Sequence, residues 1–138
     1  MVIVDSSVWI EAARRDGDLA CKVVLEGLLE EYEAVLSSPV LLEVLGGARR
    51  GEREKLRGYF DVVTYWCVEE IDWQAAVRNS WALRDAGCAI PWNDILVASL
   101  ALRRRCRVYA RDRHFDEMKR VLGLHLYEPG PGGSFSPQ

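Results

Sequence analysis

The sequence predicts an α/β fold, in which a mainly parallel central sheet carries helices on both faces. Two observations support this prediction. Short runs of β-branched and aromatic residues alternate along the chain with longer segments of helical periodicity. Strands that alternate with helices are joined by crossover connections, which make the strands parallel. The 138 residues fit one compact domain with a sizeable core.

Five short segments are expected to form strands. The first, Val2–Val4, is wholly apolar, which is typical of a strand buried on both faces. The segment 64–68 combines a threonine, two aromatic residues and a valine, all of which are favoured in strands. In chain order, the five predicted strands are Val2–Val4, 34–37, 64–68, 107–110 and 124–127.

Seven segments are expected to form helices. Asp5, Ser6 and Ser7 have N-cap chemistry, so the first helix begins directly after the first strand. Pro39 occupies a favoured first helical position. The segment 93–104 is apolar nearly all round and is expected to be central and buried. In chain order, the predicted helices are 6–14, 19–32, 39–46, 53–63, 72–86, 93–104 and 113–122.

The end of the chain differs in composition from the rest. From Pro129 the sequence is rich in proline, glycine and serine and lacks the apolar content needed to pack, which predicts disorder. The expected organisation is therefore one domain over residues 1–128 and a disordered tail over 129–138. Apolar stretches are much shorter than the roughly 20 residues of a membrane helix. No basic segment precedes the first strand as in a secretory signal, so the expected compartment is the cytoplasm.

Composition excludes several kinds of site. The two histidines cannot form a histidine-rich metal centre. The net charge, 18 − 21 = −3, argues against a protein that coats nucleic acid non-specifically. The cysteines are widely separated and show neither zinc-ligand spacing nor a disulfide framework. They are interpreted as ordinary half-buried thiols: Cys21, Cys67, Cys88 and Cys106.

Arginines are concentrated between positions 103 and 113. The planar guanidinium group suits phosphate recognition. For the triple 103–105, complementing a helix C-terminus is an equally good interpretation. Arg111 and Arg113 flank Asp112, and we expect them to contact substrate.

Four acidic residues stand where a core-building pattern has no use for a charge: Asp5, Glu43, Asp94 and Asp112. Asp5 and Asp112 follow predicted strands, Asp94 begins a helix, and Glu43 lies about one turn into another. An isolated carboxylate in apolar surroundings is costly unless it is paired or bound to a cation. All four can converge beyond the carboxyl ends of the strands, where they would form an oxygen-rich site for a hard cation.

Each acid taken alone has a structural alternative. Asp5 and Asp112 have N-cap chemistry, and Asp94 suits the first turn of a helix behind an Asn93 cap. No cap role is available to Glu43, whose neighbours are apolar on both sides. The joint pattern is therefore what favours a common site.

Other chemistries fit the sequence less well. The first strand is not followed by the Asp-x-Asp of a phosphoaspartate enzyme, and no late lysine follows a strand as in a receiver domain. Glycine-rich loops that cradle nucleotide phosphates are absent. A nucleophilic pair of Ser7 and His114 lacks a nucleophile elbow around the serine.

Four segments together resemble a known family. They are VDSSVWI at 4–10, SPVLLEV at 38–44, PWNDILVA at 91–98 and VYARDRHF at 108–115. In this order they resemble the four motifs of PIN-domain ribonucleases, in particular the VapC-like toxins of type II toxin–antitoxin pairs. The resemblance spans roughly residues 1 to 128 and implies the three-layer PIN-like fold.

The resemblance implies a metal-dependent endoribonuclease that a cognate antitoxin holds inactive, and a homodimer. The cofactor would be Mg²⁺ or Mn²⁺, and a metal-activated water would hydrolyse the RNA phosphodiester bond. Asp5, Glu43, Asp94 and Asp112 would take the family's catalytic and metal-binding positions. Ser7 matches the hydroxyl position that helps to order the metal and its waters.

Several residues near the motifs need separate interpretation. The family often has serine or threonine where Ala110 stands, so this chain lacks one hydroxyl near its last acid. Asp116 is expected at the surface rather than as a fifth site acid. Trp9, Trp92 and Tyr109 have rings that could stack on bases, but a core position is favoured for each.

Two alternatives remain open on the sequence. The chain could be a non-catalytic PIN-like module that binds RNA or protein, or a DNA-directed nuclease of related fold. The apolar segments 19–29 and 40–45 exceed what a chain of this size easily buries. They are expected to contribute surface for the antitoxin and the homodimer.

Overall fold

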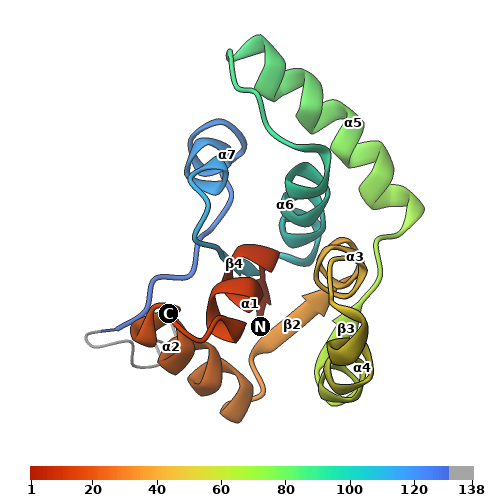
Figure 1. Ribbon diagram of the computed structural model, residues 1–138. Helices are drawn as coiled ribbons and strands as arrows, with labels where there is room; N and C mark the ends of the chain where they lie inside the picture. The colour runs from red at the N-terminus through yellow and green to blue at the C-terminus, as the bar shows by residue number, and fades with distance from the viewer. Residues whose placement is uncertain (131–138) are drawn as a thin grey trace.

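A four-stranded parallel sheet forms the centre of the computed structural model, which describes residues 1–130 (Figure 1). Its strands are β1 (Val2–Val4), β2 (Ala34–Ser37), β3 (Thr64–Trp66) and β4 (Arg107–Tyr109), in the spatial order β3-β2-β1-β4. Ile3 of β1 pairs with Val35 on one side and Val108 on the other, so β1 is an inner strand. The predicted α/β class with a parallel sheet is confirmed.

Seven α-helices and one 3₁₀ turn connect the strands within residues 1–130. The 3₁₀ turn η1 (Arg50–Glu52), which leads into α4, was not predicted. The helices are α1 (Ser6–Ala13), α2 (Leu19–Glu30), α3 (Ser38–Gly46), α4 (Arg53–Phe60), α5 (Glu70–Asp85), α6 (Trp92–Arg104) and α7 (His114–Leu122).

The order of the strands creates a crevice beyond the carboxyl ends of β1 and β4. The chain moves from β1 to β2 to β3 in one direction and returns past β1 to β4. Because crossovers are right-handed, α1 to α4 belong to one face, and α5 and α6 to the other. α7 packs with α5 and α6, so β1 and β4 are neighbours whose following helices lie on opposite faces. Sheets of this type bind ligands at such a switch point, beyond the carboxyl ends of the strands.

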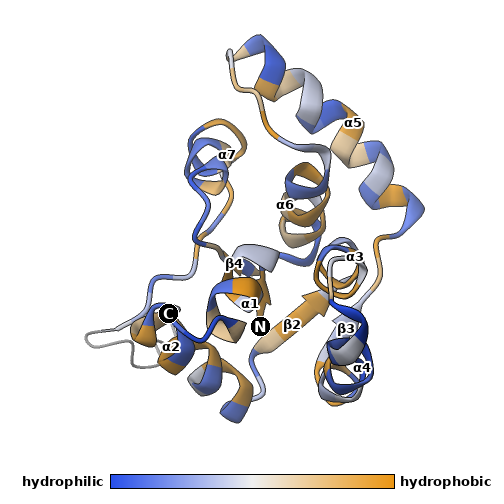
Figure 2. Ribbon diagram, viewed as in Figure 1, coloured by the Kyte–Doolittle hydropathy of each residue, from blue (hydrophilic) through white to orange (hydrophobic). Residues whose placement is uncertain are grey.

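The core is built on β1 and α6. All three residues of Val2–Val4 are fully buried, as expected for an inner strand covered on both faces. α6 is buried from Asp94 to Ala101, which confirms its predicted central position. Figure 2 shows β2 and much of α6 in the orange of apolar residues, whereas the ribbon of α5 at the edge of the molecule has mixed colours.

One buried acid lies outside the predicted acidic set. Asp72, in the first turn of α5, has no exposed surface. The guanidinium group of Arg103 on α6 donates to both of its carboxylate oxygens, and the backbone N–H of Glu69 donates to Oδ2 at 2.9 Å. Burial alone raises the pKa of Asp72, but the hydrogen bonds and the charge of Arg103 outweigh it and hold the pKa below its ordinary value. The pair joins α5 to α6.

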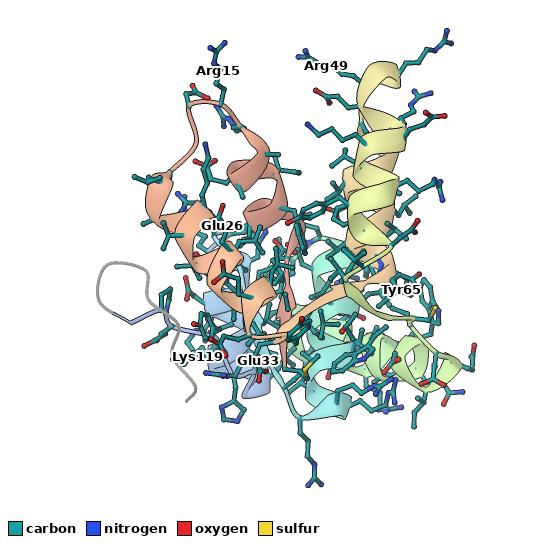
Figure 3. The ribbon with its side chains drawn as sticks, turned by 90° about the horizontal axis from the view of Figure 1, so that it is seen from below. Arg15, Glu26, Glu33, Arg49, Tyr65 and Lys119 are labelled. Carbon is teal, nitrogen blue, oxygen red and sulfur yellow. The ribbon has the colours of Figure 1, made fainter. Side chains whose placement is uncertain are left out.

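The three arginines 103–105 make contacts and cap the helix at the C-terminal end of α6. Arg103 binds Asp72, and the Arg104 guanidinium lies 4.4 Å from the ring centroid of Trp66. Arg105 adopts a left-handed conformation, with φ of 54°, and caps the helix. These contacts favour the helix-end interpretation. Other basic side chains, such as Arg15 and Arg49, point away from the body (Figure 3).

The last predicted strand is wrong. Segment 124–127 forms an isolated bridge of Leu126 with Val108. The backbone N–H of Val108 donates to His125 O, and that of Tyr127 donates to Val108 O, so both bonds involve one residue of the short β4. A ladder long enough for a strand does not form. The strand predicted at 64–68 also ends early, at Trp66.

The remaining expectations have mixed outcomes. No helix among the described residues is long and apolar enough to span a membrane. All cysteines are free, but of the four only Cys106 is half-buried; Cys21 and Cys88 are buried and Cys67 is exposed. The tail predicted from residue 129 lies outside the described residues from position 131 onward.

Candidate active site

Asp5 and Ser7 join the ends of the two strands that border the crevice. Asp5 is buried, caps α1, and accepts hydrogen bonds at Oδ2 from the Ser7 backbone N–H (3.1 Å) and hydroxyl (2.6 Å). Its own backbone N–H donates to Tyr109 O at the end of β4 (2.9 Å). The Ser7 hydroxyl in turn accepts from the backbone N–H of Arg111 at 3.0 Å. The Asp5 carboxylate is therefore fixed by contacts on both strands.

Glu43 reaches the site from the first turns of α3. One carboxylate oxygen accepts from the Ser6 hydroxyl, and the other accepts from Asn93 Nδ2 at 2.9 Å. Ser6 belongs to α1 and Asn93 to α6, so Glu43 connects α3 to the starts of α1 and α6. This explains why a half-buried acid interrupts an otherwise apolar helix.

Asp94, Asp112 and His114 form the tightest group in the site. His114 Nδ1 lies 3.0 Å from Asp94 Oδ2 and 3.0 Å from Asp112 Oδ1. The His114 backbone N–H also donates to Asp112 Oδ1 at 3.1 Å. One ligand atom from each residue falls within 4.8 Å of the other two, a grouping that fits a single metal ion. Two carboxylates and one imidazole are suitable ligands for a divalent cation such as Mn²⁺.

The electrostatics of the site are those of crowded acids. Burial raises the pKa of Asp94 to about 6; the charges of Asp5 and Asp112 add to this, and the hydrogen bond with His114 opposes it. Burial also raises the pKa of Asp5, and the charge of Glu43 contributes, although the Ser7 hydrogen bonds act in the opposite direction. A bound cation would relieve both the burial cost and the repulsion.

The structure places all four predicted acids at the crevice, in a row rather than in one cage. The charge of Glu43 contributes to the raised pKa of Asp5, and the charge of Asp5 contributes to that of Asp94. Asp94 and Asp112 both contact His114. Only Asp94 and Asp112 belong to the tight group. Asp116 is exposed on α7 and outside that group, in agreement with its expected surface position.

The structure shows the surroundings of the two arginines predicted to contact substrate and of the three aromatic residues near the motifs. The Arg111 guanidinium donates to Asp18 at 3.0 Å, so it already has a carboxylate partner, whereas Arg113 is exposed. Trp9 and Tyr109 are buried as predicted. The core position favoured for Trp92 is wrong, because the residue is 69% exposed. It is the first residue of α6 and precedes the inward-facing part of that helix.

Three side chains at the site were not identified from the sequence. His114 was considered only as the partner of a serine nucleophile, although it stands two positions after Asp112. Asn93 was interpreted as a helix cap, but Pro91 occupies the cap position and Asn93 binds Glu43. Ser6 was likewise interpreted as a cap residue. Their place next to Asp112, Asp94 and Asp5 in the motifs is the only signal in the sequence.

Two hollows flank the acids. One, about 430 Å³ and open, is lined by Ser7, Glu11, Arg111, Asp112 and Arg113. The other, about 590 Å³, lies between the end of α5, the loop 87–91 and the start of α6, and His114 forms part of its wall. We call it the Trp92 pocket, after an exposed aromatic residue of its wall. Asp112 thus lines the polar hollow, and its neighbour His114 lines the more apolar one.

Comparisons with known proteins agree with this architecture. A family model of the PIN domain matches residues 2–121. Ribonuclease VapC11 from Mycobacterium tuberculosis is 32% identical over 128 residues, which cover 90% of this chain and 96% of that protein. The VapC ribonuclease Mb1587 from Mycobacterium bovis gives the same values.

Solved structures show the same fold at lower sequence identity. FitAcB from Neisseria gonorrhoeae has a TM-score of 0.76 at 16% identity, covering 93% of this chain and 97% of that one. VapBC2 from Rickettsia felis, bound to a DNA fragment from its promoter, has a TM-score of 0.74 at 21% identity, covering 92% and 98%.

Proposed function

The chain belongs to the PIN domain family, and from this premise we propose that it is an endoribonuclease, the toxin of a toxin–antitoxin pair. The observation that carries the proposal is the convergence of Asp5, Glu43, Asp94 and Asp112 from four separate segments at the switch point of the sheet. Burial and the charges of neighbouring acids raise the pKa of Asp5 and of Asp94. Within residues 1–130, the imidazole of His114 contacts Asp94 and Asp112. Such an arrangement is suited to binding a cation, and the ribonuclease names of the relatives support RNA as the substrate.

The cofactor that fits this site is a divalent cation, Mg²⁺ or Mn²⁺. Asp94 and Asp112 would hold it directly, and Asp5 and Glu43 would complete the negative surroundings. When bound, such an ion supplies Lewis-acid chemistry: it neutralises charge on the phosphate and makes water a better nucleophile near neutral pH. The donor set of carboxylate oxygens agrees with both ions, and the nitrogen of His114 suits Mn²⁺ better than Mg²⁺.

The remaining residues position the acids and the substrate. Ser7 fixes the Asp5 carboxylate, and Asn93 holds Glu43 in place. Arg113 lines the polar hollow beside Asp112 and is exposed, so it is suited to hold a phosphate of the RNA. Arg111 also lines this hollow, and its guanidinium group keeps further N–H donors beside the one that binds Asp18. Because the proposed nucleophile is water, the site needs no nucleophilic side chain.

An antitoxin and a second copy of the chain are the proposed protein partners, and the cytoplasm is the proposed place of action. Structures similar in fold include toxin–antitoxin complexes from several bacteria. Large apolar side chains remain exposed on α5, α2 and α3, including Trp73 and Trp81 (52% and 63% exposed), Leu19 and Leu42. The sequence drew attention to 19–29 and 40–45, whereas α5 carries two exposed tryptophans in addition. Such exposed apolar groups favour protein contacts.

Incubation of the purified chain with single-stranded RNA, structured RNA and DNA tests the function. We expect RNA cleavage with Mg²⁺ or Mn²⁺ and none with EDTA. Binding of RNA without cleavage under any divalent ion would favour a non-catalytic module, and cleavage of DNA alone would favour a DNA-directed nuclease. Metal binding is measured separately by thermal melting, because an ion at about 100 times its Kd stabilises the folded state by about 2.7 kcal/mol.

A further inference from the structure

We propose that the Trp92 pocket binds an unpaired base of the RNA substrate, with the ring of Trp92 as the surface on which that base stacks. The inference rests on the proposed function and deepens it by naming the substrate class. RNA that is single-stranded, or looped at the cleaved position, can deliver a base to this pocket, whereas a base held in a duplex cannot.

The exposure of Trp92 is the first observation behind the proposal. The ring is 69% exposed although Trp92 begins the most buried helix of the molecule, in which Ile95 and Leu96 are 3% and 6% exposed. Single exposed apolar residues are common on protein surfaces, so exposure alone is not informative. This ring, however, forms the wall of a hollow and lies two positions before Asp94. Any of the four bases can stack on an aromatic ring in such a position.

Continuity with the acids is the second observation. His114 lines the Trp92 pocket, and its Nδ1 contacts the carboxylates of both Asp94 and Asp112. A ligand in the pocket is therefore separated from the acidic site by a single side chain. A base bound there belongs to a nucleotide next to the phosphate that the acids would act on. An apolar hollow elsewhere on the surface would have no such relation to the chemistry.

The composition of the wall is the third observation. Leu83, Ile95 and Cys88 make the inner part apolar, which suits the flat face of a base and is unfavourable for a phosphate. Ser80 and Arg84 line it as well and supply polar groups. The volume of about 590 Å³ falls within the range of about 300–1,000 Å³ of pockets that hold small ligands.

Arg84 gives the pocket a complement to the charge of a nucleotide. It is exposed, and within residues 1–130 it forms no ion pair with an acid. The Ser80 hydroxyl donates to Val77 O at 2.6 Å, which leaves its oxygen lone pairs available to accept from a base. A base on Trp92 with its phosphate near Arg84 uses both features. An apolar side chain of a protein partner would use neither.

The test uses short single-stranded RNA that carries 2-aminopurine at one position at a time, bound to the full chain in EDTA. We expect the fluorescence of 2-aminopurine to change at one position, because stacking on an indole ring quenches it. Trp92→Ala should remove this change and weaken binding about tenfold or more. Trp92→Phe should retain part of both effects. Tyr32→Ala, which removes another exposed aromatic side chain outside the pocket, is the control and should change neither.

An abasic nucleotide makes the test specific. Placed at the responsive position, it should slow metal-dependent cleavage by wild-type protein about tenfold or more, and have no further effect on Trp92→Ala. Equal effects on the two proteins would overturn the proposal, as would normal RNA binding by Trp92→Ala. Loss of antitoxin binding with unchanged RNA binding would assign the pocket to a protein side chain. If no RNA is cleaved but the fluorescence change depends on Trp92, the proposed function fails and the pocket stands.

Discussion

Two buried aspartates of neighbouring helices, Asp72 and Asp94, have opposite surroundings. Asp72 on α5 receives a two-point contact from Arg103 and a backbone N–H, and these hold its pKa below the ordinary value despite its burial. Asp94 on α6 faces Asp5 and Asp112 with only His114 as counterpart, and its pKa is raised to about 6. The charge of the Asp72 carboxylate is balanced by contacts within the protein, and the charge of the Asp94 carboxylate is not fully balanced.

Asp72 therefore contributes to the stability of the fold, whereas Asp94 is placed to bind a ligand. A buried ion pair with complete hydrogen bonding fixes two helices relative to each other. Acids placed side by side lower the stability of the empty protein and are compatible with folding only because the rest of the core supports them. Such clusters mark functional sites. Four experiments test whether the contrast between Asp72 and Asp94 holds.

The largest effect is expected from Asp94→Asn. The substitution keeps the size of the side chain but removes a charge that a divalent cation requires, so RNA cleavage should fall by at least about 100-fold, more than for loss of a supporting residue. The metal-dependent rise in melting temperature should decrease as well. Asp116→Asn, on an exposed acid outside the tight group, should leave both unchanged. Full activity of purified Asp94→Asn would remove the proposed site.

Asp72→Asn should affect stability instead. It removes the buried charged partner of Arg103, which keeps a second carboxylate, Glu69, at 2.8 Å, and we expect a loss of about 2–3 kcal/mol in the free energy of unfolding, measured by urea titration. The value lies near the lower end for broken buried pairs because Arg103 is 26% exposed. Cleavage per folded molecule should be unchanged. Asp16→Asn, which breaks a pair between exposed side chains, should change stability by less than about 0.5 kcal/mol. Equal effects of the two substitutions would show that Asp72 is not a structural ion-pair partner.

Asn93→Ala should have an intermediate effect on activity. Without the hydrogen bond from Asn93 Nδ2, the Glu43 carboxylate loses one of its two anchors, and metal affinity or cleavage should fall about 10- to 100-fold. The matched control is Asn79→Ala, because Asn79 Nδ2 donates to Ser99 at the same distance, 2.9 Å, away from the site. If both variants lose activity equally, the Glu43 contact has no special role.

The smallest effect is a pH dependence of the metal-free protein. The pKa of Asp94 is raised from 3.8 to about 6 in the folded state, so its stabilising contribution is complete below the unfolded value and is lost as the pH rises through about 6. Between pH 7 and 5 we therefore expect a gain of about 1 kcal/mol in stability. Asp72, whose pKa is lowered, acts oppositely and only at more acidic pH.

Thermal melts in EDTA across this range measure the effect. Asp94→Asn should flatten the curve between pH 7 and 5 and raise the melting temperature at neutral pH, because it removes the repulsion. A curve of the same shape for Asp94→Asn and wild type would show that another group governs the dependence. A lower melting temperature for the variant at neutral pH would contradict the crowding of the acids.

The sequence predicted the positions of helices and strands better than the contacts between them. Alternating patterns located β1, β2 and the helices to within a few residues, because local propensity and periodicity act over short distances. It failed at 124–127, where a strand depends on how long its neighbour β4 is. The four acids were recognisable because each lies within an apolar run or beside the end of one. Their arrangement in a row was not, because it depends on where three helices begin in space.

Interpretation of individual side chains failed for the same reason. Trp92 looks like a core residue by type, and its exposure follows from the turn at which α6 starts. Asn93 has the chemistry of a cap, yet its side chain binds Glu43, a residue 50 positions away. His114 is separated by 20 positions from Asp94, which it contacts. Local rules give no information about such distant contacts.

The order in which the chain is synthesised delays its activity. β1 and Asp5 leave the ribosome before β4, so β1 gains its second neighbour only when β4 follows, and Asp112 comes after β4. A nascent chain that ends before β4 has neither the crevice nor the tight group of Asp94, Asp112 and His114. Such a chain lacks the carboxylates that would hold the cation, so the proposed nuclease activity can begin only after the segment beyond β4 has folded. The proposed antitoxin would be needed only from that moment on.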